Sequence, residues 1–123
     1  MYAVHISESK LLDLPGRDVR VFIGTERLHS DRMTVGLTEV PPQTAMTPHT
    51  HTDKEEIIFI LEGYGEADVG GAIEVLEAYT AVQFPIGVQH QVINKSRNPM
   101  RFVFAFSPVN DFGMSTEERG TPR

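Results

Sequence analysis

Cysteine is absent from this sequence of 123 residues. Without cysteine the chain can form no disulfide, and thiolate nucleophiles, zinc fingers and iron–sulfur ligation are excluded as well. Any metal that the protein binds must therefore be held by histidine and carboxylate side chains. The absence also fits a cytoplasmic location, which we expect for this protein.

Long apolar runs and clusters of basic residues are also missing. The longest apolar runs, Ile57–Leu61 and Phe102–Phe106, are far shorter than the ~20 residues that a membrane helix needs. The first ten residues show no basic start followed by an apolar stretch, so we expect no secretory signal. A net charge of -6 without a basic cluster would repel phosphate backbones. We therefore expect a soluble protein whose partner is a small molecule, and neither nucleic acid nor a membrane.

What the chain does have is the size and composition of one globular domain. Hydrophobic residues make up 40% of it and charged residues 23%, which is ordinary for a folded protein. It contains no internal repeat and no linker-like stretch. We assign residues 1–114 to a single domain and the polar residues 115–123 to a C-terminal tail.

Short segments rich in Val, Ile, Phe and Thr alternate with Gly, Pro, Asn and Asp along most of the chain, a pattern typical of strands and turns. No window of helical length keeps a 3.6-residue period. The sequence therefore predicts an all-β fold, either a sandwich or a closed barrel, with a tight hairpin turn at Gly70-Gly71. The predicted strands are Val19–Ile23, Met33–Val40, Ala45–His51, Glu56–Leu61, Gly65–Val69, Ile73–Leu76, Thr80–Phe84, His90–Asn94 and Met100–Phe106.

Two of these strands carry apolar residues on both faces. Because neither Ile57–Leu61 nor Phe102–Phe106 alternates, we expect both faces of each to be buried. A barrel of this size buries only one face of a strand in its interior, so the other face must pack on a second sheet or on a partner chain. We therefore expect a homodimer. The alternative is that both segments are central strands in the sandwich of one monomer.

Three of the five histidines fall into two turn-rich segments. His49 and His51 are two residues apart, which places both imidazoles on one face of a strand. Glu56 opens the next apolar strand after a polar turn, and a carboxylate is costly to bury there unless a positive charge meets it. His90 follows a turn at Pro85–Gly87. Imidazole and carboxylate together suit one divalent transition metal, that is Mn, Fe, Co, Ni, Cu or Zn.

Other interpretations of the histidines remain open at this point. His51 and Asp53 with His90 could form the His-x-Asp…His triad of iron oxygenases, which would leave His49 without a role. His5 lies outside the cluster, as does His29, and we expect both to be surface or hydrogen-bonded residues.

The same histidines carry a resemblance to the cupin family. The first cupin motif is G-x5-H-x-H-x(3,4)-E-x6-G, and this chain has Gln43, His49, His51, Glu56 and Gly63 at its positions. The second motif is G-x5-P-x-G-x2-H-x3-N, and here the chain has Tyr79, Pro85, Gly87, His90 and Asn94. Both partial matches occur in the order and at the separation typical of compact cupins.

The resemblance implies a single-domain double-stranded β-helix, also called a jelly roll, that commonly forms homodimers. Glu55 also fits the first spacing, but only Glu56 leaves six residues before Gly63. Gln43 and Tyr79 replace the leading glycines, which are turn positions, so these departures concern loop shape and not metal binding. The ligand set implied by the resemblance is His49, His51, Glu56 and His90.

The resemblance does not choose a reaction, because cupins include dioxygenases, isomerases, decarboxylases, lyases and binding proteins. Ile58 and Ile60 share the face of Glu56, which predicts a mainly apolar pocket that suits a sugar phosphate poorly. We expect a metal-dependent enzyme, dioxygenase- or isomerase-like, that acts on a small oxygen-bearing organic molecule. The alternative is a non-enzymatic ligand-binding or regulatory cupin with a structural or sensing metal. No catalytic residue is assigned. The polar candidates for the pocket are Gln89, Gln91, Tyr64, Tyr79 and Arg101.

Overall fold

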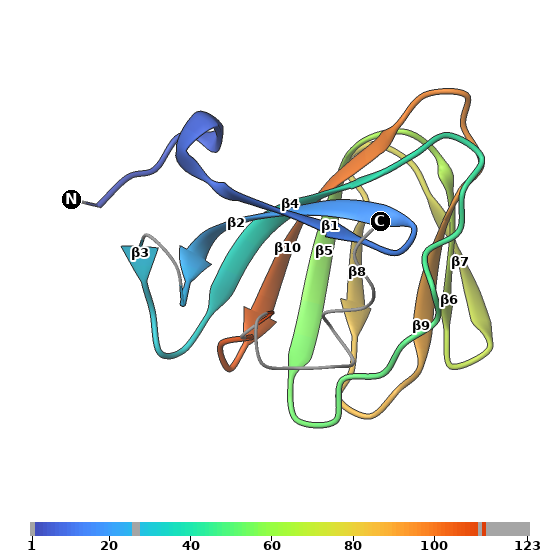
Figure 1. Cartoon of the computed structure of the whole chain (residues 1–123). Helices are drawn as coiled ribbons and strands as arrows, with labels where there is room; N and C mark the ends of the chain where they lie inside the picture. The colour runs from blue at the N-terminus through green and yellow to red at the C-terminus, as the bar shows by residue number, and fades with distance from the viewer. Residues whose placement is uncertain (1, 26–27, 111, 113–123) are drawn as a thin grey trace.

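Two β-sheets face each other in the computed structural model of this chain, which describes residues 2–25, 28–110 and 112 (Figure 1). The described residues contain no α-helix, and no helix among them has the length and apolar character to cross a membrane. The elements are η1 (Ile6–Glu8), β1 (Lys10–Leu14), β2 (Arg17–Gly24), β3 (Leu28–His29), β4 (Thr34–Val40), β5 (Glu55–Glu62), β6 (Gly65–Val69), β7 (Ala72–Leu76), β8 (Ala81–Phe84), β9 (His90–Asn94) and β10 (Met100–Ser107).

The larger sheet runs in the order β1-β2-β4-β10-β5-β8, with β3 paired to β2, and the smaller sheet runs β7-β6-β9. Every pairing is antiparallel except that of β3 with β2. Strand β10 is the last of the described strands along the chain, yet it pairs with both β4 and β5. Strands that are neighbours in this sheet are therefore far apart in the sequence. This arrangement confirms the predicted all-β jelly roll in a single domain.

Most of the predicted strands are present, and the Gly70-Gly71 turn joins β6 to β7 as predicted. The prediction of a regular strand at Ala45–His51 is wrong. That segment makes only two isolated bridges, Ala45 with Ile93 and His49 with His90. Pro48 interrupts it, since proline has no N–H to give to a ladder. Strands β1 and β3 were not predicted. The tail prediction for residues 115–123 lies outside the described residues.

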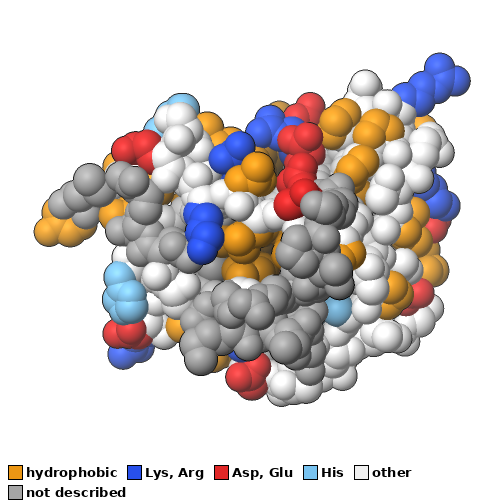
Figure 2. Space-filling view, viewed as in Figure 1, with side chains coloured by type: hydrophobic (Ala, Val, Ile, Leu, Met, Phe, Trp, Pro, Cys, Tyr) orange, Lys and Arg blue, Asp and Glu red, His pale blue; other side chains and the backbone are white. Residues whose placement is uncertain are grey.

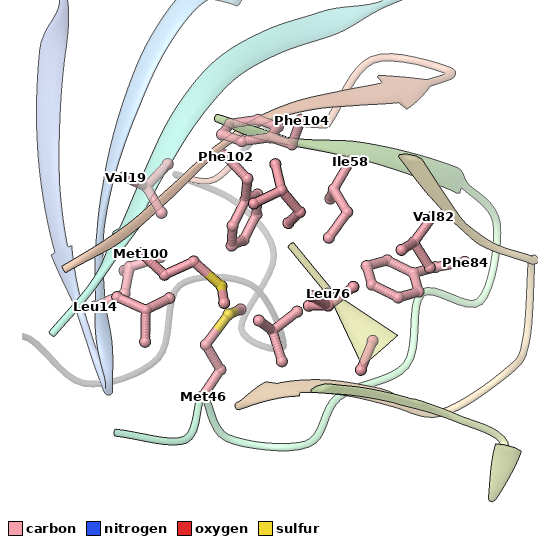
Figure 3. Packing of buried hydrophobic residues seen from close by; sticks show 14 of the residues in the cluster. Leu14, Val19, Met46, Ile58, Leu76, Val82, Phe84, Met100, Phe102 and Phe104 are labelled. Carbon is pink, nitrogen blue, oxygen red and sulfur yellow. The ribbon is translucent and has the colours of Figure 1, made fainter. Parts of the chain in front are cut away.

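Alternate residues of β5 and β10 fill the space between the sheets, as Figure 3 shows for Ile58, Phe102 and Phe104. Ile58 and Ile60 of β5 are fully buried, and burial of each such side chain contributes about 1.5–3 kcal/mol. The outer face of β5 is different. Ile57, Phe59 and Leu61, which we call the outer apolar patch, are 40–47% exposed. The alternative, in which one monomer buries both faces of β5, is therefore wrong.

Two sets of contacts hold the segment between β4 and β5, which carries the histidine pair. Gly16 has a φ of 73°, and a Cβ there would lie 3.0 Å from the carbonyl oxygen of Ala45. The turn between β1 and β2 can therefore pack directly against the segment that leads to the histidine pair. At the far end of β9, the buried Asn94 amide donates to the carbonyl oxygens of Val40 and Pro41, at 3.0 Å each. Asn94 is thus a structural residue.

Charges are mixed on the face of the molecule seen in Figure 2, where basic side chains lie among acidic and hydrophobic ones. Hydrophobic side chains also reach the surface on the side where β6 and β7 lie. On β7, Ile73 is 53% and Val75 is 74% exposed, since β7 is an edge strand of the smaller sheet.

Candidate metal centre

Four side chains from three segments converge inside one end of the barrel. The first two come from the bridged segment before β5, the third from β5 and the fourth from the start of β9. One ligand atom from each lies within 4.8 Å of the others, which is a spacing at which they could hold a metal ion. The four residues are His49, His51, Glu56 and His90.

Backbone hydrogen bonds tie the two motifs together at this point. The N–H of His49 donates to the carbonyl oxygen of His90 at 3.0 Å, and the reverse bond is 2.9 Å long. The N–H of Gly87 donates to the carbonyl oxygen of His51 at 2.8 Å. Gly87 has a φ of 77°, which favours glycine. The turn of the second motif therefore positions the histidine pair of the first.

The imidazole rings are oriented by backbone carbonyls. His49 Nδ1 lies 2.9 Å from the carbonyl oxygen of Thr47, and His90 Nδ1 lies 3.2 Å from that of Val88. A carbonyl oxygen only accepts, so each Nδ1 carries a proton and each ring turns its Nε2 towards the site. Such partners orient the histidine ligands of metal sites.

The contacts between ligand atoms test whether the site fits a cation. Glu56 Oε1 lies 3.2 Å from His51 Nε2 and 3.3 Å from His90 Nε2. The latter nitrogen is buried and has no hydrogen-bond partner among the described residues. A carboxylate oxygen and an imidazole lone pair repel each other unless a proton or a metal lies between them. The donor set therefore fits a divalent metal.

The protonation states favour the same conclusion. Burial lowers the pKa of His49 to about 4, and repulsion from the His90 ring adds to this effect. Burial alone would raise the pKa of Glu56, but the His51 and His90 side chains outweigh burial and hold this pKa at about 2. At neutral pH the site thus offers a neutral imidazole and an ionised carboxylate, the forms that bind metals.

Two aromatic side chains pack against the rings. Phe84 stacks on His90 with ring centroids 4.1 Å apart and the planes 3° from parallel. The edge of Phe106 meets His51 at 4.9 Å. These contacts restrict the orientations of the His51 and His90 rings.

A small cavity of about 20 Å³ adjoins the cluster. It has room for roughly one water molecule. Most of its lining is aromatic or aliphatic, which agrees with the mainly apolar pocket expected from the sequence. The lining residues are Arg17, Val19, Thr38, Met46, His49, Glu56, Phe102, Phe104, Phe106 and Phe112.

The polar lining differs from the prediction. Arg17 and Thr38 contribute to it, although neither was predicted, and the five polar candidates do not line this cavity. A signal for Arg17 was available, because it alternates with Val19 and Val21 and so shares their inward face. Among the five candidates, Arg101 lies on the outer face with Glu39 and Glu62. Of the others, Tyr64 and Tyr79 are exposed. Gln91 donates to the Met46 carbonyl oxygen, and both Gln89 and Gln91 line a separate cavity of about 250 Å³ that also includes His90.

The remaining candidates lie outside the cluster. Asp53 is exposed and pairs with Lys54 at 3.0 Å, so the structure does not bring the alternative triad together. His5 caps the short helix η1, and His29 lies 2.7 Å from Asp31 at the surface. Both histidines are therefore the surface residues that were expected.

Comparison with known proteins agrees with this architecture. Residues 36–106 match the family model described as the cupin domain. Polyketide synthase CurC of Streptomyces cyaneus is 28% identical over 94 residues, which cover 76% of this chain and 61% of that protein. Tetracenomycin polyketide synthase protein TcmJ of Streptomyces glaucescens is 29% identical over 75 residues, or 61% of this chain and 50% of that protein.

Among solved structures, the polyketide cyclase RemF from Streptomyces resistomycificus superimposes with a TM-score of 0.73 and 26% identity. The match covers 96% of this chain and 89% of RemF. The matched part of this chain thus spans only about half to three-fifths of the two polyketide synthase proteins, but most of the cyclase.

Proposed function

This chain belongs to the cupin family, and from that premise we propose that it is a metal-dependent enzyme that cyclises a polyketide-type small molecule. The observation that carries the proposal is the buried cluster of three imidazoles and one carboxylate beside an aromatic cavity. Support for the substrate class comes from the relatives, two of which are polyketide synthase proteins and one a polyketide cyclase.

We propose that His49, His51, Glu56 and His90 bind one divalent transition metal per chain. A divalent metal at this point would act as a Lewis acid on a carbonyl or enol oxygen. Four protein ligands leave positions open on a metal that accepts five or six.

Cyclisation suits the other properties of the site. The phenylalanine side chains of β10 would pack on the conjugated skeleton of a polyketide and keep water from its reactive carbons. The names of the relatives favour cyclisation over dioxygen chemistry or simple isomerisation, the two reactions expected from the sequence, and no finding here supports either of those.

A cavity of about 20 Å³ would admit a substrate only if a lining side chain moved. Ligand pockets usually have volumes of ~300–1,000 Å³, whereas this cavity has about 20 Å³. Of the four phenylalanines that line it, only Phe112 lies outside the strands. It is therefore the one whose movement would least disturb the sheets.

The same small volume favours a second candidate function, a non-enzymatic cupin in which the metal is structural or senses a small ligand. Assays separate the two candidates. The Mn, Fe, Co, Ni, Cu and Zn forms would be incubated with linear poly-β-ketone substrates, and ring formation would be followed by mass spectrometry and absorbance. Ring formation that requires the metal supports the enzyme. A ligand that raises the melting temperature but is never converted would support the binding protein.

Metal binding is tested with matched variants. We expect purified protein to carry close to one metal per chain by elemental analysis. The Glu56→Gln variant should bind it more weakly by at least the roughly 10–100-fold that loss of an outer-shell partner of a ligand costs. The control is Asp53→Asn, which changes an exposed carboxylate in the loop that precedes β5 and should leave affinity unchanged. A wild-type protein without metal in every preparation contradicts the proposal, and so does equal affinity in the two variants.

A further inference from the structure

Thr38 carries a buried hydroxyl on the inward face of β4, where it is 3% exposed. Its neighbours across the larger sheet are Val19 of β2 and Phe102 of β10, which both belong to the hydrophobic core. Among the described residues, none forms a hydrogen bond with the Thr38 hydroxyl. A buried hydroxyl without a partner is unfavourable, and a valine of nearly the same shape would avoid that cost. The stability of the fold therefore does not explain why this position has a hydroxyl.

Thr34 shows what a buried threonine on the same strand does when it has a structural role. It lies four residues earlier on β4, faces the same side of the sheet and is also buried. Its hydroxyl donates to the carbonyl oxygen of Asn110 at 3.2 Å and accepts from the N–H of Asn110 at 2.7 Å. Thr34 thus holds the segment that follows β10 against β4, and the Thr38 hydroxyl has no such task among the described residues.

The Thr38 side chain lines the same cavity as two members of the candidate metal centre, His49 and Glu56. The cavity has a volume of about 20 Å³, so an oxygen atom placed in it would lie close to all three side chains. Most of the other walls are phenylalanine or aliphatic side chains, which offer no hydrogen bond to such an atom. Arg17 also lines the cavity, but its guanidinium already donates to the carbonyl oxygen of Pro15. Thr38 is thus the neutral hydrogen-bond donor of this cavity.

We propose that the Thr38 hydroxyl donates a hydrogen bond to a ketone or enolate oxygen of the ligand and so holds that oxygen beside the candidate metal ligands. The inference rests on the proposed function, because it uses the same cavity and the same metal. It narrows the ligand to a molecule that places an oxygen acceptor next to the metal, and it disfavours molecules that would bind the metal through nitrogen. Thr38 is thus a specificity-determining residue for the proposed reaction.

The binding test uses zinc-loaded protein and two small probes, acetylacetone and pyridine, measured by titration calorimetry. Acetylacetone would bind the metal through oxygens that also accept a hydrogen bond, whereas pyridine would bind through its single nitrogen and has no further acceptor. We expect Thr38→Val to weaken the binding of acetylacetone by roughly 5-fold to 20-fold and to leave the binding of pyridine unchanged. Thr38→Ser keeps the hydroxyl and should restore most of the affinity for acetylacetone.

Infrared spectra of isotope-labelled acetylacetone provide a readout that a purely structural role of Thr38 would not change. A hydrogen bond to a ketone or enolate oxygen lowers the C–O stretching frequency of that group. We expect the band of the bound probe to lie at a lower frequency in the wild type and in Thr38→Ser than in Thr38→Val.

Unfolding in urea provides a test that needs neither metal nor ligand. Thr38→Val removes a buried hydroxyl without a partner, so the metal-free variant should keep or raise the urea midpoint of the wild type. Thr34→Val is the matched control, because it removes a hydroxyl that forms two hydrogen bonds with Asn110 and should lower the midpoint. The control should leave the ratio of the two probe affinities unchanged.

Several results would overturn the proposal. A Thr38→Val variant that loses as much stability as Thr34→Val would show that the hydroxyl has a structural role. A zinc-loaded wild type that does not bind acetylacetone, or a Thr38→Val variant with unchanged affinity and unchanged band frequency, would show that Thr38 does not contact a ligand oxygen. Metal content is measured in every sample. A wild type that retains no metal refutes the proposed function instead, and the infrared band of acetylacetone with the metal-free protein then decides whether Thr38 contacts the ligand.

Discussion

At the scale of single residues, the two substituted motif glycines are informative. Gln43 and Tyr79 both adopt positive φ, 56° and 71°, so the glycine-type turns of the cupin motifs are kept by residues that are strained in them. The sequence shows the two substitutions but not the backbone conformation. Loss of the glycine could mean that the turn itself has changed, or that another residue occupies the same turn.

Strain at Tyr79 leads to a stability prediction. We expect Tyr79→Gly to raise the free energy of unfolding by about 0.5–1 kcal/mol, since relief of left-handed strain exceeds the entropy lost by glycine. Urea unfolding measures the change. Ala78→Gly in the same turn is the control, because Ala78 has no positive φ and should lose stability by a similar amount. A loss of stability in Tyr79→Gly would refute the argument.

The buried histidine makes stability depend on pH. His49 has a pKa of about 4 in the folded protein and 6.5 ordinarily, so between these values the unfolded chain binds a proton that the folded chain does not. Acidification through this window should therefore lower the free energy of unfolding of metal-free protein by about 3 kcal/mol. Glu56 extends the loss below pH 4.5, towards its pKa of about 2. Urea unfolding midpoints measured across this pH range report both losses of stability. The His49→Gln variant should not show the loss between pH 6.5 and about 4.

At the scale of elements, strands were predictable where short segments rich in Val, Ile, Phe and Thr lie between turn residues, as in β4 and β10. The segment before β5 was not, because its histidines look like a strand while Pro48 breaks the ladder. The two bridges nonetheless preserve what the strand was predicted to do, which is to bring His49 and His51 to one place. The inward position of Arg17 follows from the alternation of buried residues in β2, but Arg17 was not among the predicted polar residues of the pocket.

The outer apolar patch of β5 is the element on which the predicted homodimer depends. Each of its three side chains is at least 40% exposed, and Val103 and Ala105 of the paired strand β10 adjoin them. Burial of such a patch against its own copy about a two-fold axis would remove apolar surface from water.

The dimer stays a prediction, with a direct test. Sedimentation equilibrium should show a dimer for the wild type and a monomer for Phe59→Glu, which places a charge in the centre of the patch. Ile73→Glu is the control, because it alters an equally exposed apolar side chain on β7 of the other sheet. A monomeric wild type, or a Phe59→Glu variant that remains dimeric, would show that the outer apolar patch is not a dimer interface.

At the scale of the whole molecule, the jelly roll could be predicted because two motifs and many short strands point to one family. What the sequence could not show is the closure of the barrel. The outer exposure of β5, the small volume of the cavity and the entry of Arg17 into it all depend on how the sheets pack against each other. Such packing arises from contacts between residues far apart in the chain.

The four candidate metal ligands come from both sheets, and this has a consequence for the stability of the barrel. Glu56 belongs to the larger sheet and His90 to the smaller one, so a metal bound to both would join the two sheets at one end of the barrel. It would also close a long loop of the chain, which is what a disulfide does for the unfolded state. In a protein that has no cysteine, the metal would be the molecule's cross-link as well as its reactive centre.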